Sequence, residues 1–299
     1  MQNISLAGWR IVIAGGDARD VILAEQLKKA GADVWLCGFE KCALPKDATL
    51  QKGKPEFADV VILPLPGVNS DGTIYATYAE EKLFLDNLSP LFRPGLLLIC
   101  GRMPTETLAF LEERKIRVVL TAEMDELAVY NAVPTAEGTI ELAMRESDVT
   151  IHGSKALVIG FGRCGMPLAK TLAALGARVT VGARRREVLA QAETLGFAQL
   201  DLAKISERIG DFDFIFNTVP AMVLTDKVLG GVNKEALVID IASKPGGTDF
   251  AAAKRLGLKT FLALGLPGKV APKSAGNILA RVYPHIITEM GKGGEHNEA

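Results

Sequence analysis

Six residues near the middle of the chain have the types and spacing that bind a dinucleotide. They are Gly160, Phe161, Gly162, Arg163, Cys164 and Gly165, which follow the apolar run 156–159 and open a helical pattern over 166–175. In such a strand, turn and helix, the first glycine allows the turn, the second admits the pyrophosphate and the third lets helix and strand pack closely. The alternative is a glycine turn that only closes a strand–helix unit.

The residues after the next expected strand indicate which dinucleotide is bound. Ala183, Arg184 and Arg185 stand where an acidic side chain would bind the ribose hydroxyls of NAD. Guanidinium groups bind phosphate in a planar, bidentate manner, so we expect NADP in preference to NAD. NAD stays possible, because these arginines could also belong to a solvated helix start.

Two further segments follow strands at the sheet edge where open α/β sheets bind ligands. The residues expected to contact the cofactor there are Asn217, Thr218, Val219, Pro220, Ile241 and Ala242. Lys244 has no local carboxylate before Asp249, so we expect it to bind an anionic ligand and to act in catalysis. An ordinary surface lysine is the alternative.

The first turn of the N-terminal half has a different pattern, Gly15-Gly16-Asp17. It lacks the third glycine, and Asp17 would repel a pyrophosphate, so we expect no dinucleotide there. Asp17 is a suitable N-cap for the helix that follows. Arg19 lies in the first turn of that helix, against the favourable dipole, and therefore requires an anion such as a substrate carboxylate. A solvated arginine without a ligand is the alternative.

Other polar residues at expected strand ends and helix starts would face a cleft between two domains. The expected substrate contacts are Gly16, Asp17, Arg19, Arg102, Asn131, Thr135, Ser243 and Lys269. Three carboxylates near the expected hinge could accept a proton: Glu123, Asp125 and Glu137. Glu137 is our first choice as the catalytic base, and helix capping is the alternative for all three.

Two copies of one architecture would position these residues. Apolar strands are expected at 10–14, 33–37, 60–63, 96–100 and 117–120, and again at 156–159, 178–181, 212–216, 237–241 and 259–262. Strands alternating with helices predict an α/β fold with parallel, doubly wound sheets, here two Rossmann-like domains. The interval from Gly15 to Gly31-Ala32-Asp33-Val34 equals that from Gly160 to Gly176-Ala177-Arg178-Val179, which supports the duplication.

The length of 299 residues also predicts two domains. We expect an N-terminal substrate or partner domain over 1–150, including a linking helix over 133–146 that Pro134 starts or kinks. The NADP-binding domain would cover 151–299, with a helix over 272–290 that returns to the first domain and a frayed polar tail over 291–299.

Composition argues against several classes of protein. Apolar residues make up 48% and the formal net charge is −1, which does not suggest disorder or binding to nucleic acid or membranes. No apolar run approaches the ~18 residues of a membrane span, and the N-terminus lacks a signal pattern, so we expect a cytoplasmic protein. Four scattered cysteines and three scattered histidines predict no metal site.

Four longer motifs resemble those of the family formed by the A subunits of dipicolinate synthase. They lie at 13–19 (IAGGDAR), 130–138 (YNAVPTAEG), 239–250 (IDIASKPGGTDF) and 265–272 (GLPGKVAP), and the likeness covers nearly the whole chain. The resemblance implies oxidation of dihydrodipicolinate to dipicolinate (pyridine-2,6-dicarboxylate) with NADP, in the mother-cell cytoplasm during sporulation. It also implies a heteromeric complex in which the partner is the flavoprotein-like B subunit of dipicolinate synthase, and we expect the chain to form homo-oligomers.

Two alternatives stay open. The two-domain layout also resembles the D-2-hydroxy acid dehydrogenases, which have Ala-Arg-Gly after a late strand and a catalytic His downstream. This chain has Ala242-Ser243-Lys244 there, and its late histidines are His285 and His296, which argues against alcohol oxidation. A non-catalytic, NADP-sensing subunit is the second alternative.

Overall fold

The computed structural model describes residues 4–43 and 50–291. The chain forms two compact units, unit 1 (Met1–Tyr130 with Pro272–Ala299) and unit 2 (Asn131–Ala271). Each unit is built on a six-stranded sheet whose neighbouring strands run parallel. His296 and most of the predicted tail lie outside the described residues.

The sheet of unit 1 has the strand order β3-β2-β1-β4-β7-β8. Its strands are β1 (Arg10–Ala14), β2 (Asp33–Cys37), β3 (Gln51–Lys52), β4 (Val60–Ile62), β7 (Leu97–Cys100) and β8 (Arg117–Leu120). A short antiparallel hairpin is added by β5 (Thr73–Ile74) and β6 (Leu83–Phe84). The helical segments are α1 (Ala18–Lys29), η1 (Leu85–Leu91), α2 (Thr105–Glu113), η2 (Thr121–Glu123) and α10 (Pro272–Gly291).

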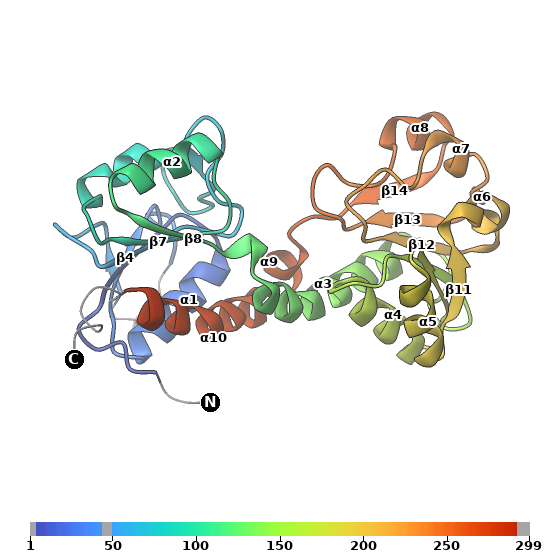
Figure 1. Cartoon of the computed structure of the whole chain (residues 1–299), viewed down its shortest axis with the longest axis horizontal. Coiled ribbons are helices and arrows are strands. Elements are labelled where there is room, and N and C mark those ends of the chain that lie inside the picture. Colours follow the sequence, from blue (N-terminus) through green and yellow to red (C-terminus); the bar gives the residue numbers. More distant parts are fainter. Residues whose placement is uncertain (1–3, 44–49, 292–299) are drawn as a thin grey trace. The chain divides into compact units, whose positions relative to one another are not determined.

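Helix α10 joins unit 1 although it follows unit 2 in the sequence. It lies beside α1 on one face of the sheet, and α2 covers the other face (Figure 1). Leu279, Val282 and Tyr283 of α10 belong to the same buried core as Leu23 of α1. A Cβ at Gly276 would lie 2.6 Å from the Cβ of Ile22, so glycine permits this close approach. The prediction that the C-terminal helix returns to the first domain is confirmed.

The sheet of unit 2 has the order β11-β10-β9-β12-β13-β14. Its strands are β9 (Lys155–Ile159), β10 (Arg178–Ala183), β11 (Ala198–Asp201), β12 (Phe214–Asn217), β13 (Leu237–Asp240) and β14 (Lys259–Leu262). The helical segments are α4 (Gly165–Ala174), α5 (Arg186–Thr194), η3 (Leu202–Lys204), α6 (Ile205–Arg208), η4 (Ile209–Asp211), α7 (Asp226–Leu229), α8 (Phe250–Arg255) and α9 (Leu266–Val270). This strand order is that of a Rossmann fold, so the predicted fold class is confirmed.

Alternate residues of the unit 2 strands pack on opposite faces of the sheet, as the two-residue repeat of a strand requires. Val158 of β9 belongs to the core that includes Leu168 of α4. Its neighbour Leu157 belongs to a second core with Ala252 of α8. Figure 1 shows α4 and α5 on one side of this sheet and α6, α7 and α8 on the other.

Helix α3 (Asp125–Glu146) is longer than the predicted 133–146 and contains Pro134. The two units divide within it, between Tyr130 and Asn131, and not at the predicted 150/151 boundary. The physical reason is that Ala136 and Ile140 of α3 are buried in the core of unit 2. Among the described residues, no helix combines the length and apolar character needed to cross a membrane.

Candidate functional site

The three glycines of the central motif occupy three different environments after β9. Gly160 has φ +90°, and a Cβ there would overlap the Thr218 hydroxyl. A Cβ at Gly165 would overlap the carbonyl oxygen of Gly160, whereas a Cβ at Gly162 would meet no atom within 4 Å. Gly160 thus makes the turn, Gly165 lets the helix pack on the strand, and Gly162 leaves open the space through which a pyrophosphate approaches a dinucleotide turn.

Helix α4 starts directly at this turn, and its first turn contains no acidic residue. Cys164 is at the N-cap and its side chain makes no capping bond. The Met166 amide donates to the Gly162 carbonyl at 3.1 Å and Pro167 has no amide hydrogen, so the Gly165 amide is the one that the first turn of α4 can offer to an anion. Burial raises the pKa of the Cys164 thiol, which is typical of an unreactive cysteine. Phe161 is buried and packs edge-on against Phe197, so its side chain stabilises the core beneath the turn.

The arginines after β10 lie on the surface at the start of α5. Ala183 is the last, buried residue of the strand, and Arg184 and Arg185 are exposed. Arg185 forms an ion pair with Glu187 at 3.2 Å, while Arg184 has no ion pair with a described residue. The end of β11 adds Asp201, which pairs in register with Ala183 and accepts a bond from the Ala203 amide. Sequence reasoning did not find Asp201, because the strand that carries it is short and half polar.

The loop after β12 uses its polar side chains within the fold. Asn217 is fully buried, its side-chain amide donates to the Val219 carbonyl at 3.0 Å, and its oxygen accepts from the Val219 amide at 3.2 Å. The Thr218 hydroxyl donates to the Ile159 carbonyl at 2.9 Å, which ties this loop to the glycine turn. Pro220 and Met222 are exposed in this loop. The side chains of Asn217 and Thr218 therefore hold the loop in place, and their contacts with the cofactor stay a prediction.

The loop after β13 is organised by Asp240, a residue that sequence reasoning missed. Its carboxylate is fully buried and accepts bonds from the Ala242 amide, the Gly247 amide and the Thr248 hydroxyl. Ala242 is buried and Ile241 half-buried, whereas Ser243 and Lys244 are exposed. A signal was present in the sequence, since an acidic residue that ends an apolar strand requires donors when it is buried.

The first turn of unit 1 is covered by its own chain. The Gly16 amide donates to the Tyr75 carbonyl at 2.7 Å, and the Thr77 amide donates to the Gly16 carbonyl at 2.9 Å. A Cβ at Gly15 would lie 2.7 Å from the same Tyr75 oxygen. These glycines admit a neighbouring segment of protein, and the absence of a dinucleotide here stays a prediction.

Arg19 has an anionic partner inside the protein. Its Nε and Nη2 donate to the two Asp17 carboxylate oxygens at 2.9 and 2.8 Å, and the side chain is only 8% exposed. No described residue accepts a bond from its Nη1. Asp17 is the N-cap of α1, as predicted, and forms a capping box with Asp20. Burial raises the pKa of the Asp20 carboxyl to about 7.

The remaining expected substrate contacts are spread over several elements. Arg102 and Lys269 are exposed, and Lys269 lies on α9. Thr135 donates from its hydroxyl to the Asn131 carbonyl at 2.7 Å, one turn earlier in α3. The side-chain oxygen of Asn131 is buried without a hydrogen-bond partner, the single such atom among the described side chains. An acceptor in this state is a candidate for a ligand donor.

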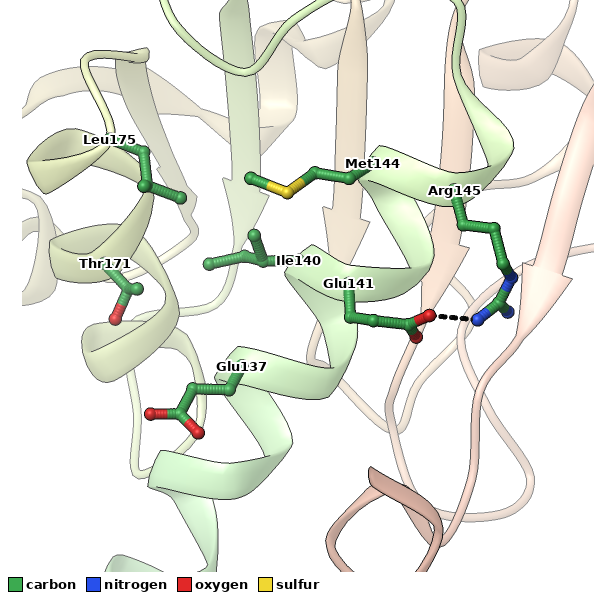
Figure 2. Close-up of a pocket in the computed structure, with 7 residues that line it drawn as sticks. All are labelled: Glu137, Ile140, Glu141, Met144, Arg145, Thr171 and Leu175. Carbon is green, nitrogen blue, oxygen red and sulfur yellow. Dashed lines mark hydrogen bonds and ion pairs between the residues drawn. The ribbon is translucent and has the colours of Figure 1, made fainter. Parts of the chain in front are cut away.

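Glu137 lies in a groove between α3 and α4, which Figure 2 shows with its lining residues. The groove has a volume of about 530 Å³ and is lined by Glu137, Ile140, Glu141, Met144, Arg145, Thr171 and Leu175. Thr171 lies in the second half of α4 and Leu175 is its C-cap, so both are away from the glycine turn at the start of the helix. The structure thus places Glu137 beside the second half of α4 and does not bring it to the strand ends that carry Lys244.

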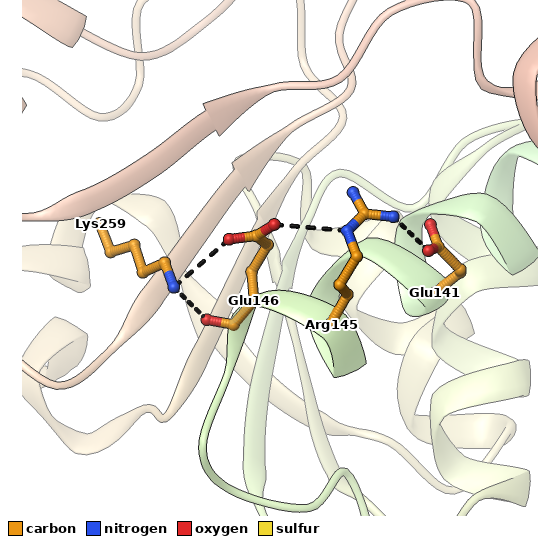
Figure 3. Close-up of polar contacts among 4 residues, drawn as sticks. All are labelled: Glu141, Arg145, Glu146 and Lys259. Carbon is orange, nitrogen blue, oxygen red and sulfur yellow. Dashed lines mark hydrogen bonds and ion pairs between the residues drawn. The ribbon is translucent and has the colours of Figure 1, made fainter.

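The end of α3 beyond Glu137 carries a chain of surface ion pairs (Figure 3). Arg145 contacts Glu141 and also Glu146, the latter at 3.4 Å, and Glu146 contacts Lys259 of β14 at 3.4 Å. Exposed pairs of this kind each contribute about 0.2–1 kcal/mol. Their arrangement indicates that they attach the end of α3 to the sheet.

No three His, Cys, Asp or Glu side chains in the described part gather to hold a metal ion.

Comparisons with known proteins identify the two halves. Residues 10–122 match the family described as the N-terminal domain of the dipicolinate synthase A subunit. Residues 129–242 match the NAD binding domain of D-isomer specific 2-hydroxyacid dehydrogenases. The dipicolinate synthase A subunit of Bacillus subtilis (strain 168) is 37% identical over 293 residues, covering 95% of this chain and 98% of the relative. The chain belongs to the family of dipicolinate synthase A subunits.

Solved structures from the same family agree with this result. The dipicolinate synthase A subunit from Bacillus halodurans has a TM-score of 0.88 and 36% identity, covering 95% of this chain and 99% of that one. The corresponding protein from Bacillus subtilis has a TM-score of 0.86 and 37% identity, covering 97% and 99%. A transhydrogenase from Sinorhizobium meliloti, at 18% identity and a TM-score of 0.69, shares the fold. The family match at residues 129–242 makes unit 2 a dehydrogenase-type domain for a nicotinamide cofactor.

Proposed function

We propose that this member of the dipicolinate synthase family oxidises dihydrodipicolinate to dipicolinate with NADP as hydride acceptor. The observation that carries the proposal is the glycine turn of unit 2, open at Gly162 and closed at Gly160 and Gly165, in a chain 37% identical to a dipicolinate synthase A subunit. NADP, when bound, accepts the hydride that leaves a ring carbon of the substrate. The remaining ring proton is released, and the product is the aromatic pyridine.

The residues present fit the cofactor. The open space at Gly162 and the uncapped start of α4 are suited to the pyrophosphate. Arg184, exposed and without an ion-pair partner among the described residues, is available to a 2'-phosphate, and we propose NADP over NAD on this ground.

The substrate carries two carboxylates and therefore needs cations and donors to bind it. We assign this role to the Nη1 of Arg19 and to the exposed Lys244, with contributions from Arg102, Ser243 and Lys269. Gly16, Asp17 and Thr135 use their polar groups within the fold, so they would shape the site and not donate to a carboxylate. The unpartnered oxygen of Asn131 is suited to accept a bond from a donor group of a ligand. Since aromatisation supplies much of the driving force, positioning is the main task of these residues, and it can lower a barrier by roughly 7–11 kcal/mol.

Glu137 stays our proposed proton acceptor, although its carboxylate faces the α3–α4 groove. It is exposed, so a proton can also reach it through water. We further propose that the enzyme works with the B subunit of dipicolinate synthase and as a homo-oligomer, in the mother-cell cytoplasm of a sporulating bacterium. The relatives are named as the A member of a multi-subunit enzyme, which supports a partner of this kind.

The test is the absorbance of NADPH at 340 nm after mixing the purified protein with NADP and dihydrodipicolinate, with and without the B subunit. The proposal expects absorbance to rise with substrate. Confirmed NADP binding without any rise in either mixture would refute the enzyme and favour a cofactor-sensing subunit.

The match of residues 129–242 supports one second candidate, a 2-hydroxy acid dehydrogenase. Ser243-Lys244 stands where those enzymes have Arg-Gly, and His285 is on α10 of unit 1. The same assay with 2-hydroxy acids in place of dihydrodipicolinate separates the two reactions.

A further inference from the structure

Asp240 organises the loop that follows β13, which packs against the loop that follows β12. One carboxylate oxygen accepts the Ala242 amide at 2.9 Å, and the other accepts the Gly247 amide at 2.9 Å and the Thr248 hydroxyl at 2.7 Å. All three donors belong to the loop that carries Lys244. A fully buried carboxylate with only donors around it is therefore used to fix the course of this loop.

Gly247 carries the connection on to the other loop. Its carbonyl accepts bonds from the amides of Val223 and Leu224, at 3.0 and 2.9 Å. A Cβ at Gly247 would lie 2.5 Å from both the side-chain nitrogen of Asn217 and the carbonyl oxygen of Val219. The loop that holds Lys244 is thus packed against the loop that follows β12, with no space for a side chain at Gly247.

These bonds matter because a buried carboxylate is costly unless it is fully hydrogen-bonded. Hydrogen bonds to charged groups contribute about 1.5–3 kcal/mol each. Replacing Asp240 by Asn keeps the shape but turns one acceptor into a donor. In the wild-type protein the Gly247 amide and the Thr248 hydroxyl donate to the same carboxylate oxygen. In the Asn variant an NH₂ group at that position would face these two donors without accepting a bond from them.

We infer that Asp240 is a positioning residue, which holds the Lys244 loop against the loop at 217–220 so that both present one fixed surface to the ligands. The inference rests on the proposed function for its choice of ligands. Asp240 is fully buried and acts through Lys244 and the loop backbone.

The experiment measures NADPH binding by fluorescence titration, the KM for dihydrodipicolinate, and the melting temperature of three variants. Asp240→Asn should raise the NADPH Kd and the KM by ~10-fold or more, the effect of about 1.4 kcal/mol. Thr248→Val removes one of the three donors and should give a smaller change in the same direction. Asp213→Asn is the matched control. Asp213 also accepts a bond from a backbone amide, that of Lys155, but it lies at the amino end of β12, away from the ligand loops, and is partly exposed.

A role in stability alone would lower the melting temperature of Asp240→Asn and leave the Kd of the folded protein unchanged, and this result would overturn the inference. If Asp240→Asn does not fold, Thr248→Val decides the matter by the same comparison of Kd with melting temperature. The wild-type protein separates this inference from the proposed function. NADPH binding without substrate oxidation would refute the reaction, while the Kd values of the variants would still test Asp240.

Discussion

Alanine substitutions at Gly162 and Gly165 separate binding of the cofactor from folding of the turn. At Gly162 the backbone φ is not positive and a Cβ would meet no atom within 4 Å, so the fold should accept alanine. The new methyl group would stand in the space that the pyrophosphate needs. At Gly165 a Cβ would overlap the Gly160 carbonyl oxygen, so the backbone of the turn must move.

The magnitudes follow from these contacts. Loss of one charge-assisted hydrogen bond between an amide and the pyrophosphate costs about 1.5–3 kcal/mol, which corresponds to a roughly 10- to 150-fold weaker NADPH Kd for Gly162→Ala. Its melting temperature should match that of the wild type. For Gly165→Ala we expect weaker binding together with a melting temperature lower by several degrees, because overpacking costs about 1–3 kcal/mol.

Fluorescence titration with NADPH and thermal unfolding of the same samples provide the assay. Gly230→Ala is the matched control, because the nearest atom to a Cβ there would be the Asp226 carbonyl oxygen at 3.5 Å and its φ of −60° suits alanine. Unchanged NADPH affinity in Gly162→Ala would refute the assignment of this turn to the pyrophosphate. Equal loss of stability in both glycine variants would refute the distinction between an open and a closed glycine.

Three further predictions concern specificity, proton transfer and pH. Replacing Arg184 and Arg185 by alanine should weaken NADP binding by ~10-fold or more and leave NAD binding unchanged, with Arg186→Ala as the control. If titrations give the same ratio of the NADP Kd to the NAD Kd as in the wild type, the pair does not determine cofactor choice. Glu137→Gln should lower kcat ~100-fold and leave the NADPH Kd unchanged, with Glu141→Gln in the same groove as the control. An unchanged kcat would indicate that water, and not Glu137, accepts the proton. Because burial raises the pKa of Asp20 from 3.8 to about 7 in the fold, deprotonation disfavours the folded state, and the melting temperature should fall as pH rises from about 4 towards 7. Asp20→Asn should reduce this fall, whereas Asp86→Asn, an exposed acid of the same unit, should not; equal slopes in all three proteins would disprove the effect of Asp20.

The sequence predicts the fold well where apolar runs are long enough to form buried strands. The expected strands at 10–14, 33–37, 117–120 and 259–262 coincide with β1, β2, β8 and β14. Strand β3, with the residues Gln51 and Lys52, has no apolar signal, because it is an edge strand paired on one side. The start of α3 at Asp125 was also missed, since Pro134 suggested a boundary that the helix accommodates.

The candidate site was predictable in its backbone and less so in its side chains. Glycine is required by a steric condition, so the three roles at Gly160, Gly162 and Gly165 follow from spacing. A polar side chain at a strand end can bind either a ligand or the neighbouring backbone, and sequence cannot distinguish these outcomes. Asn217 therefore appeared as a ligand contact although both its amide atoms are used by Val219.

The segment at Tyr75–Thr77, which crosses the Gly15–Gly16 turn of unit 1, has a consequence for the number of cofactors in this duplicated fold. The chain repeats the architecture of a nucleotide-binding domain but fills one of the two nucleotide positions with its own backbone. Because this segment belongs to the same chain, its local concentration at the turn is fixed, and we expect that free dinucleotide does not displace it. We therefore expect one dinucleotide for each chain, which leaves the strand ends of unit 1 available for other ligands.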